Sequence, residues 1–262
     1  MTEDILTPAP APDIGPDEPV SGVFSTEVMA TIGAGTTKRR APQKIYMFVE
    51  DLGDGQVTVQ PVNKNFVPSG KKTVLTREKL LKDYLPEPSV YMHSVSPAMR
   101  ALEAAADRGD QHREKDELFS AEFEYKNALR VDEEHVRSTF GLGLTYLKRS
   151  ELRSAEAVFK RIVTLESAFE VRHKHLFNDF GIQLRRNGLF AQAMEYYGRA
   201  IQLTGQDENL FFNLARAAYE SGRLREAREH AEKALALNPG LAEARKLLVA
   251  VCKAIETKKI VL

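Results

Sequence analysis

A short pattern recurs along the second half of this chain: an alanine, an aromatic residue four positions later, and a small or apolar residue three positions after that. Three copies begin at Ala121, Ala155 and Ala193, and a fourth, at Ala227, lacks the aromatic residue. Successive copies start 34, 38 and 34 residues apart (155 − 121, 193 − 155 and 227 − 193). A period of this length is typical of a solenoid, in which one supersecondary unit packs on copies of itself.

Each copy of the pattern is expected to lie on a helix, because spacings of three and four place side chains on one helix face. A second helical segment precedes each of the last three copies and carries a small residue at the same offset: Gly143, Gly181 and Ala215. A glycine inside a helix costs about 1 kcal/mol relative to alanine and is tolerated where another helix packs too closely for a Cβ. The repeating unit is therefore predicted to be a tight antiparallel helix hairpin.

The period, the Leu142-Gly143-x-x-Tyr146 run and the Ala155-x-x-x-Phe159 run resemble the tetratricopeptide repeat, and Pro239 matches the proline that closes the family consensus. The resemblance covers a little over half of the chain. It implies a mainly α fold with an antiparallel helix-hairpin solenoid over residues 96–257. The register gives four repeats and a terminal capping helix at about 102–135, 136–169, 174–207, 208–241 and 242–257.

Two places depart from the family register. Ser96 followed by Pro97 predicts the start of a helix and Gly109 predicts its end, which displaces the first helix of the first repeat. Residues 170–173 are additional at the junction between the second and third repeats. The superhelical twist is expected to change at that junction.

Composition sets limits on the class of protein. The chain has 262 residues and a formal net charge of zero, so it has no global basic excess to attract nucleic acid. It has no apolar run long enough to span a membrane, and its acidic N-terminus does not resemble a secretory signal. The single cysteine, Cys252, excludes an intrachain disulfide and is expected to be buried. A cytoplasmic protein without a membrane span is predicted.

Residues 1–40 are rich in proline and acidic residues, and we predict a disordered tail. Within this tail, residues 20–28 form an apolar island that contains Val23 and Phe24. Two interpretations stay open. The island either acts as a binding peptide that occupies the groove of the repeats as an internal competitor, or it packs on the neighbouring domain.

Residues 41–90 are predicted to form a small β-rich module that ends in a helix. Residues 44–49 and 56–60 are rich in strand-forming residues and flank a Gly-Asp-Gly turn, which predicts a β-hairpin. Residues 72–75 are a possible third strand, and Thr76 is expected to cap a helix over residues 77–84.

Several motifs resemble chemical sites but lack the required context. The 69–73 segment lacks the upstream glycine of a phosphate-binding loop, and the glycines of residues 32–37 lack the strand and helix of a dinucleotide site. His173 and His175 are two residues apart, which is a poor spacing for chelation on a helix, and residues 108–110 read as an interhelix turn. The sequence shows no nucleophile–base set. We therefore predict no enzyme activity, cofactor or metal.

Binding is expected on the concave face, which the first helices of stacked hairpins line. The stripe beside their core positions mixes cations, asparagines and apolar residues and contains no acidic residue. Asparagine can hold a peptide backbone, and arginine can bind a carboxylate with two parallel hydrogen bonds. We predict a groove for an acidic or C-terminal peptide, lined by Arg137, Phe140, Leu144, Lys148, His175, Asn178, Ile182, Arg185, Asn209, Phe212, Asn213, Arg216 and Tyr219.

One subclass of the family binds chaperone C-termini through a set of lysines, asparagines and an arginine. Only Asn213 matches that set here, so this partner is not predicted. The function predicted is a protein–protein interaction module, acting as adaptor, scaffold or assembly factor. The alternative is a regulatory or sensor protein whose β module at residues 43–84 binds a ligand or partner. RNA binding is less favoured, because the net charge is zero and the stripe holds few cations.

Overall fold

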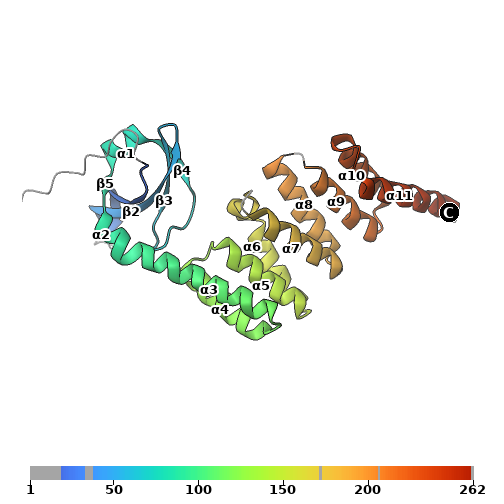
Figure 1. The fold of residues 1–262 in the computed structure, drawn as a ribbon, viewed down its shortest axis with the longest axis horizontal. Coiled ribbons are helices and arrows are strands. Elements are labelled where there is room, and N and C mark those ends of the chain that lie inside the picture. Colours follow the sequence, from blue (N-terminus) through green and yellow to red (C-terminus); the bar gives the residue numbers. More distant parts are fainter. Residues whose placement is uncertain (1–18, 33–37, 171–172, 206, 261–262) are drawn as a thin grey trace, which may run out of the picture. The chain divides into compact units, whose positions relative to one another are not determined.

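The structure is a computed structural model that describes residues 19–32, 38–170, 173–205 and 207–260 (Figure 1). It divides into two units. The first comprises the chain up to Ala105 together with Arg130–Glu134, and the second comprises Ala106–Leu129 and the chain from His135 onward. The division therefore falls within helix α3 (Ser96–Glu114).

The first unit is built on one antiparallel sheet with the strand order β4-β3-β2-β1-β5. Its strands are β1 (Gly22–Ile32), β2 (Arg39–Gly53), β3 (Gln56–Pro61), β4 (Thr73–Thr76) and β5 (Leu85–Pro86). The predicted hairpin is present as β2 and β3, with Gly53, Asp54 and Gly55 at positive φ in its turn. Helix α1 (Arg77–Asp83) begins after Thr76, whose Oγ1 accepts a hydrogen bond from Lys79 N–H at 3.3 Å.

Strand β1 contradicts the prediction that residues 1–40 are disordered. It pairs with β2 from Gly22 opposite Val49 to Ile32 opposite Arg39. Averaging composition over the predicted tail hid this strand, because residues 22–32 contain no proline and a single acidic residue. Residues 1–18 and 33–37 of the predicted tail lie outside the described residues.

Val23 and Phe24 are core residues of the first unit, with exposed fractions of 2% and 3%. Successive side chains of a strand point to opposite faces. Phe24 packs in a cluster with Val49 and Leu80, whereas Val23 packs with Phe48 and Val95. The hypothesis that Val23 and Phe24 form a free binding peptide is therefore wrong, and packing on the neighbouring module is the outcome.

The long loop after β3 holds the Arg130–Glu134 segment within the first unit. The side-chain amides of Asn63 and Asn65 both donate to the carbonyl oxygen of Val131, at 2.9 and 2.8 Å. Ser69 Oγ donates to Asp132 Oδ1 at 2.6 Å. Segment 69–73 is thus occupied with structural hydrogen bonds.

The chain enters α3 without a break. Helix α2 (Pro88–Val90) continues through the π-helical turn Tyr91–Val95 into α3. Ser96 has helical φ and ψ of −62° and −42°, so the prediction that it starts a helix was wrong. The helix starts instead at Pro88, which fits the first helical position because its missing N–H has no partner there to lose.

The second unit is the predicted solenoid of antiparallel helix hairpins (Figure 1). Its further helices are α4 (Leu118–Val131), α5 (Val136–Lys148), α6 (Leu152–Ile162), α7 (Lys174–Arg186), α8 (Phe190–Thr204), α9 (Glu208–Glu220), α10 (Leu224–Leu237) and α11 (Ala242–Ile260). Residues 171 and 172, in the junction where a change of twist was predicted, lie outside the described residues. Cys252 lies in α11 and is partly exposed rather than buried.

Gly109 marks a close approach and does not end a helix, which corrects the predicted register of the first repeat. It precedes Ala121 by 12 residues (121 − 109), as Gly143 precedes Ala155 (155 − 143). A Cβ on Gly109 would lie 2.6 Å from Cε1 of Tyr125, and one on Gly141 would also meet that ring. The Tyr125 ring therefore packs between α3 and α5, and α3 occupies the ordinary first-helix position.

Candidate functional site

Helices α7 and α9 lie side by side and run in the same direction, and ion pairs join them at both ends. At their N-terminal ends, Lys174 Nζ donates to Asp207 Oδ2 at 3.1 Å. At their C-terminal ends, Arg185 Nη1 donates to both carboxylate oxygens of Glu220, the longer contact being 2.7 Å. The residues of the predicted stripe that lie between these pairs, on α7 and α9 of two successive repeats, are called the α7–α9 face below.

Asp207 also caps α9. Its Oδ1 accepts hydrogen bonds from the backbone N–H groups of Asn209 and Leu210, at 2.8 and 3.2 Å. Burial opposes ionisation of Asp207, but the hydrogen bonds from Lys174 and from these two N–H groups outweigh it and lower the pKa. The carboxylate therefore stays charged and fixes the start of α9 against α7.

Helix α5 is held against α3 in a comparable way, but by acidic residues of α3 and of the turn that follows it. Arg137 contacts Asp107 at 2.7 Å and donates from Nε to Asp110 Oδ2 at 2.8 Å. Lys148 contacts Asp116 at 2.7 Å. The two cations predicted to line the groove on α5 are therefore already neutralised by the protein itself.

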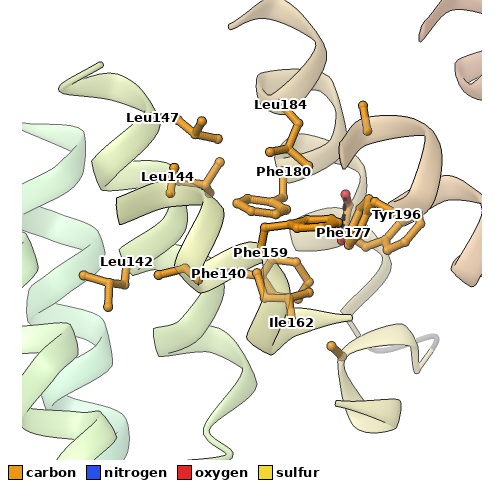
Figure 2. Packing of buried hydrophobic residues seen from close by; sticks show 14 of the residues in the cluster. Phe140, Leu142, Leu144, Leu147, Phe159, Ile162, Phe177, Phe180, Leu184 and Tyr196 are labelled. Atoms are coloured by element: carbon orange, nitrogen blue, oxygen red, sulfur yellow. Dashed lines mark hydrogen bonds between the residues drawn. The ribbon is translucent and has the colours of Figure 1, made fainter. Parts of the chain in front are cut away.

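Three residues of the predicted stripe are buried, and this corrects the prediction that they line an open groove. Phe140 and Leu144 have exposed fractions of 0% and 5%, and both belong to the main core of the second unit. Figure 2 shows Phe140 pointing toward Phe180, and the two ring centroids lie 5.6 Å apart. Phe140 and Leu144 are therefore core residues, not groove residues. Arg185 is buried as well, at 7%, with its charge held by Glu220.

The remaining accessible part of the stripe lies on α7 and α9. His175 and Asn209 are exposed, whereas the side chains of Asn178, Ile182, Phe212, Asn213, Arg216 and Tyr219 are half-buried. Within the described part of the chain, the side-chain amides of the three asparagines make no hydrogen bond, and Arg216 makes no ion pair. The guanidinium carbon of Arg216 lies 5.5 Å from the ring centroid of Phe212, a cation–π contact.

A buried hydroxyl lies beneath this face. Tyr197 Oη is fully buried and has no hydrogen-bond partner among the residues that the structure describes. A Cβ on Gly181 would lie 2.5 Å from it, so the ring packs directly under α7. Burial raises the pKa of Tyr197, and the positive charges of Arg185 and Arg216 oppose that rise. The buried hydroxyl therefore stays neutral, and its proton has no acceptor among the described residues.

Other candidate sites have structural explanations. Residues 108–110 lie inside α3 and not in the predicted interhelix turn, and Arg108 pairs with Glu124 at 2.8 Å. His173 and His175 lie at the start of α7, and no group of three His, Cys, Asp or Glu side chains among the described residues is arranged to hold a metal. None of the described helices is long and apolar enough to cross a membrane.

Sequence reasoning missed the acidic residues that close the α5 end. Asp107 and Asp110 lie one helical turn apart on α3, so they share a face. Their spacing is visible in the sequence. The predicted helix end at Gly109 conceals it, because that end places Asp110 in a turn.

Comparisons with known proteins agree with the solenoid. Residues 120–168 and 209–241 match sequence profiles described as tetratricopeptide repeat. The chain is 23% identical over 192 residues to the TPR repeat-containing protein YpiA of Bacillus subtilis (strain 168), a match that covers 69% of this chain and 44% of that protein. The chain thus spans less than half the length of this relative.

Two solved structures are similar to this chain at low sequence identity. A crystal structure of MamA protein has a TM-score of 0.45 and 22% identity, covering 58% of this chain and 81% of that one. The structure of Pseudomonas aeruginosa PilF has a TM-score of 0.45 and 18% identity, covering 60% of this chain and 70% of that one.

Proposed function

We propose that this chain, which matches tetratricopeptide repeat profiles over residues 120–168 and 209–241, binds a segment of a protein partner on the face formed by α7 and α9. The segment proposed is an extended peptide that carries a carboxylate, either at its C-terminus or on an acidic side chain. The proposal narrows the predicted groove to its third- and fourth-repeat part, because the α5 part is closed by core packing and by ion pairs.

One observation carries the proposal: among the lysines and arginines of the stripe, Arg216 alone has no ion pair with the described residues. Arg137, Lys148 and Arg185 each contact a carboxylate of the protein. Arg216 makes no ion pair within the described residues, and the buried Tyr197 hydroxyl has no hydrogen-bond partner among them. A guanidinium group presents paired N–H donors that match a carboxylate.

The asparagines supply the contacts that an extended backbone needs. A side-chain amide offers both a donor and an acceptor, so Asn178 and Asn213 can each pair with one peptide group of the ligand. The half-buried side chains of Ile182 and Tyr219, on the same two helices, can contact ligand side chains. The face therefore combines backbone recognition, apolar contact and one charge-specific position.

A display selection tests this proposal. Full-length protein is used to select from a random peptide library with free C-termini, and the affinities of selected peptides are measured by fluorescence anisotropy. Selected peptides should share a carboxylate that Arg216 binds, and Arg216→Ala should weaken binding about 10- to 100-fold, because a charge-assisted hydrogen bond contributes about 1.5–3 kcal/mol.

Arg225→Ala is the matched control, because Arg225 is an exposed arginine on α10 with no ion pair among the described residues. Its affinity should equal that of the unchanged protein. Selected peptides that bind Arg216→Ala as tightly as the unchanged protein would contradict the proposal. Peptide amidation then separates the two carboxylate sources, since it abolishes binding only where the terminus is recognised.

A further inference from the structure

Part of the β1–β2 ladder extends beyond the rest of the sheet. Strand β5 pairs with β1 only at Phe24 and Ser25. Strand β3 pairs with β2 only from Met47 onward. Residues 26–32 of β1 and 39–45 of β2 therefore form a two-stranded ribbon with both edges unpaired among the described residues. An isolated two-stranded ribbon is marginally stable in water, so a third strand would stabilise it.

The free edge of β1 keeps all of its backbone donors. Glu87 N–H donates to Val23 O at 2.7 Å, so the odd-numbered residues of β1 face the β5 side. Beyond β5, the N–H and C=O groups of Glu27, Met29 and Thr31 continue along this edge without a strand partner in the described part of the chain.

The free edge of β2 is protected instead. Val62 N–H donates to Tyr46 O at 2.9 Å, so the even-numbered residues of β2 face outward on that side. Pro42 is one of them and has no N–H to offer. A proline on an edge strand discourages pairing with another chain. Only the β1 edge is therefore suited to accept a strand.

Apolar side chains flank the β1 edge on both faces of the ribbon. Met29 is 64% exposed and Val28 is 40% exposed. As consecutive strand residues, they point to opposite faces. An unpaired edge flanked by exposed apolar side chains is an aggregation hazard unless a partner covers it.

Three consecutive cations stand at one end of the ribbon. Lys38, Arg39 and Arg40 are exposed, and their side chains make no ion pair or hydrogen bond with the described residues. Arg39 is opposite Ile32 and Arg40 is opposite Thr31, so the two arginines reach the β1 edge from opposite faces.

Positive charge dominates the ribbon as a whole. Its acidic residue is Glu27, which is opposite Lys44, and Lys44 in turn pairs with Glu87. The cations at the Thr31 end have no such partner among the described residues. The end of the edge near Thr31 is therefore electrostatically suited to carboxylates.

We propose that β1 accepts an extended acidic segment of a partner protein as an added strand. The segment pairs with the backbone of Glu27, Met29 and Thr31, places apolar side chains against Val28 and Met29, and places carboxylates near Arg39 and Arg40. In this mode of recognition, main-chain hydrogen bonds supply affinity and alternate side chains supply specificity. The surface lies in the first unit and is distinct from the α7–α9 face.

The test uses the full-length chain and a fluorescein-labelled peptide that alternates valine and threonine and ends in three glutamates. Binding is measured by anisotropy, and amide exchange is followed by NMR. The peptide should bind with an affinity that falls with salt, and exchange at Glu27, Met29 and Thr31 should slow. A peptide with lysines in place of the glutamates should bind at least about tenfold more weakly.

Two variants separate strand addition from simple charge attraction. Met29→Pro removes an N–H that faces the free edge and leaves the β1–β2 ladder intact, so it should weaken binding at least about tenfold. Met29→Ala keeps that N–H and should weaken binding less. Arg39→Glu combined with Arg40→Glu should also reduce affinity at least about tenfold. If Met29→Pro fails to fold, a peptide N-methylated at alternate residues replaces it and should not bind the unchanged protein.

Four outcomes would overturn the proposal. The first is that the acidic peptide does not bind, and the second is that the N-methylated peptide binds equally well. The third is that a short DNA duplex binds more tightly, in a way that depends on Arg39 and Arg40 but not on the Met29 N–H. The fourth is that the unchanged protein forms a dimer that Met29→Pro dissociates. The third outcome identifies a nucleic acid and the fourth a second copy of the chain. A failed peptide selection on the α7–α9 face would leave this test unaffected.

Discussion

The two ends of the predicted binding stripe use the same repeat positions in different ways. Leu144, Ile182 and Arg216 each lie eight residues after the start of their repeats (144 − 136, 182 − 174 and 216 − 208). Leu144 is core, whereas Ile182 and Arg216 remain half-buried. Position within the repeat therefore fixes which face a side chain occupies, but the neighbouring helices decide whether that face is open.

The predicted groove face of α5 is inaccessible to a ligand because the helix is buried along almost its whole length. Its polar residues are buried as well. Thr139 and Thr145 are buried, and each satisfies its hydroxyl on its own helix, donating to the carbonyl oxygens of His135 and Gly141 at 2.9 and 2.7 Å. Buried hydroxyls that bond within one helix leave nothing for a ligand. On α7 and α9, by contrast, the side-chain amides of the asparagines make no hydrogen bond with any described residue.

The largest expected effect compares Leu144→Ala with Ile182→Ala. Leu144→Ala should lower the free energy of unfolding by about 3 kcal/mol, because it leaves a cavity in a close-packed core. Ile182→Ala should lower it by only about 1 kcal/mol, since the side chain is already half-exposed. Urea unfolding of the full chain, followed by circular dichroism, measures both. Equal costs would show that the two ends are equally closed.

The next prediction tests whether α3 packs against α5 as the first helix of its repeat, at the closed end of the stripe. Gly109→Ala should destabilise the protein by about 1–3 kcal/mol, because the new methyl group would collide with the Tyr125 ring. Gly198 in α8 is the control: a Cβ there meets no atom within 4 Å, so Gly198→Ala should stabilise by about 0.5–1 kcal/mol. Stabilisation by Gly109→Ala would indicate an open helix end at this position.

A smaller effect compares two arginines of the stripe. Arg137→Ala should cost about 1 kcal/mol, because it removes two carboxylate contacts from a partly exposed network. The loss is limited because Asp110 still accepts a hydrogen bond from the Tyr125 hydroxyl. Arg216→Ala should change stability by less than about 0.5 kcal/mol while weakening peptide binding. Thermal unfolding of both variants measures the difference, and a stability loss at Arg216 matching that at Arg137 would remove the contrast.

The sequence predicted the repeat architecture well because its signals are local. The recurring alanines and the mid-helix glycines report close helix crossings, and these are present at Gly143 and Gly181. The predictions from sequence were wrong where a residue type occurs both at helix ends and inside helices. Gly109 resembled a helix stop but is a packing glycine, and Ser96 resembled a cap but is mid-helix.

The site was less predictable, because the openness of a face depends on contacts between repeats. The stripe contains no acidic residue of its own, which suggested a cationic groove. The acids that neutralise it come from other positions: Asp107 and Asp110 on α3, Asp116 in the following turn, and Glu220 at the end of α9. Pairing over such sequence distances requires the packed structure.

The smallest effect concerns the pH dependence of the closed end. Burial disfavours the ionised form of Glu122 on α4, but hydrogen bonds from Lys126, Arg149 and Tyr146 outweigh burial and lower the pKa to about 2. Because the folded-state pKa lies below that of the unfolded chain, the stabilisation is complete above about pH 5 and is lost as the pH falls toward 2. Solvent screening limits the contribution to about 1 kcal/mol.

Glu122→Gln should therefore remove about 0.6 kcal/mol, the part of this contribution lost by pH 3, from the stability difference between pH 6 and pH 3, measured by urea unfolding at each pH. The glutamine keeps a hydrogen-bond acceptor for the Tyr146 hydroxyl, which lies 2.9 Å from Glu122 Oε1, so the change isolates the charge. Glu229→Gln on the exposed face of α10 is the control, since its i, i+4 contact with Lys233 is fully exposed and should leave the pH profile nearly unchanged. If both variants reduce the pH dependence of the free energy of unfolding equally, the pairing of Glu122 with α5 and its following turn adds no stability of its own. In that case core packing alone distinguishes the closed end of the stripe from the open one.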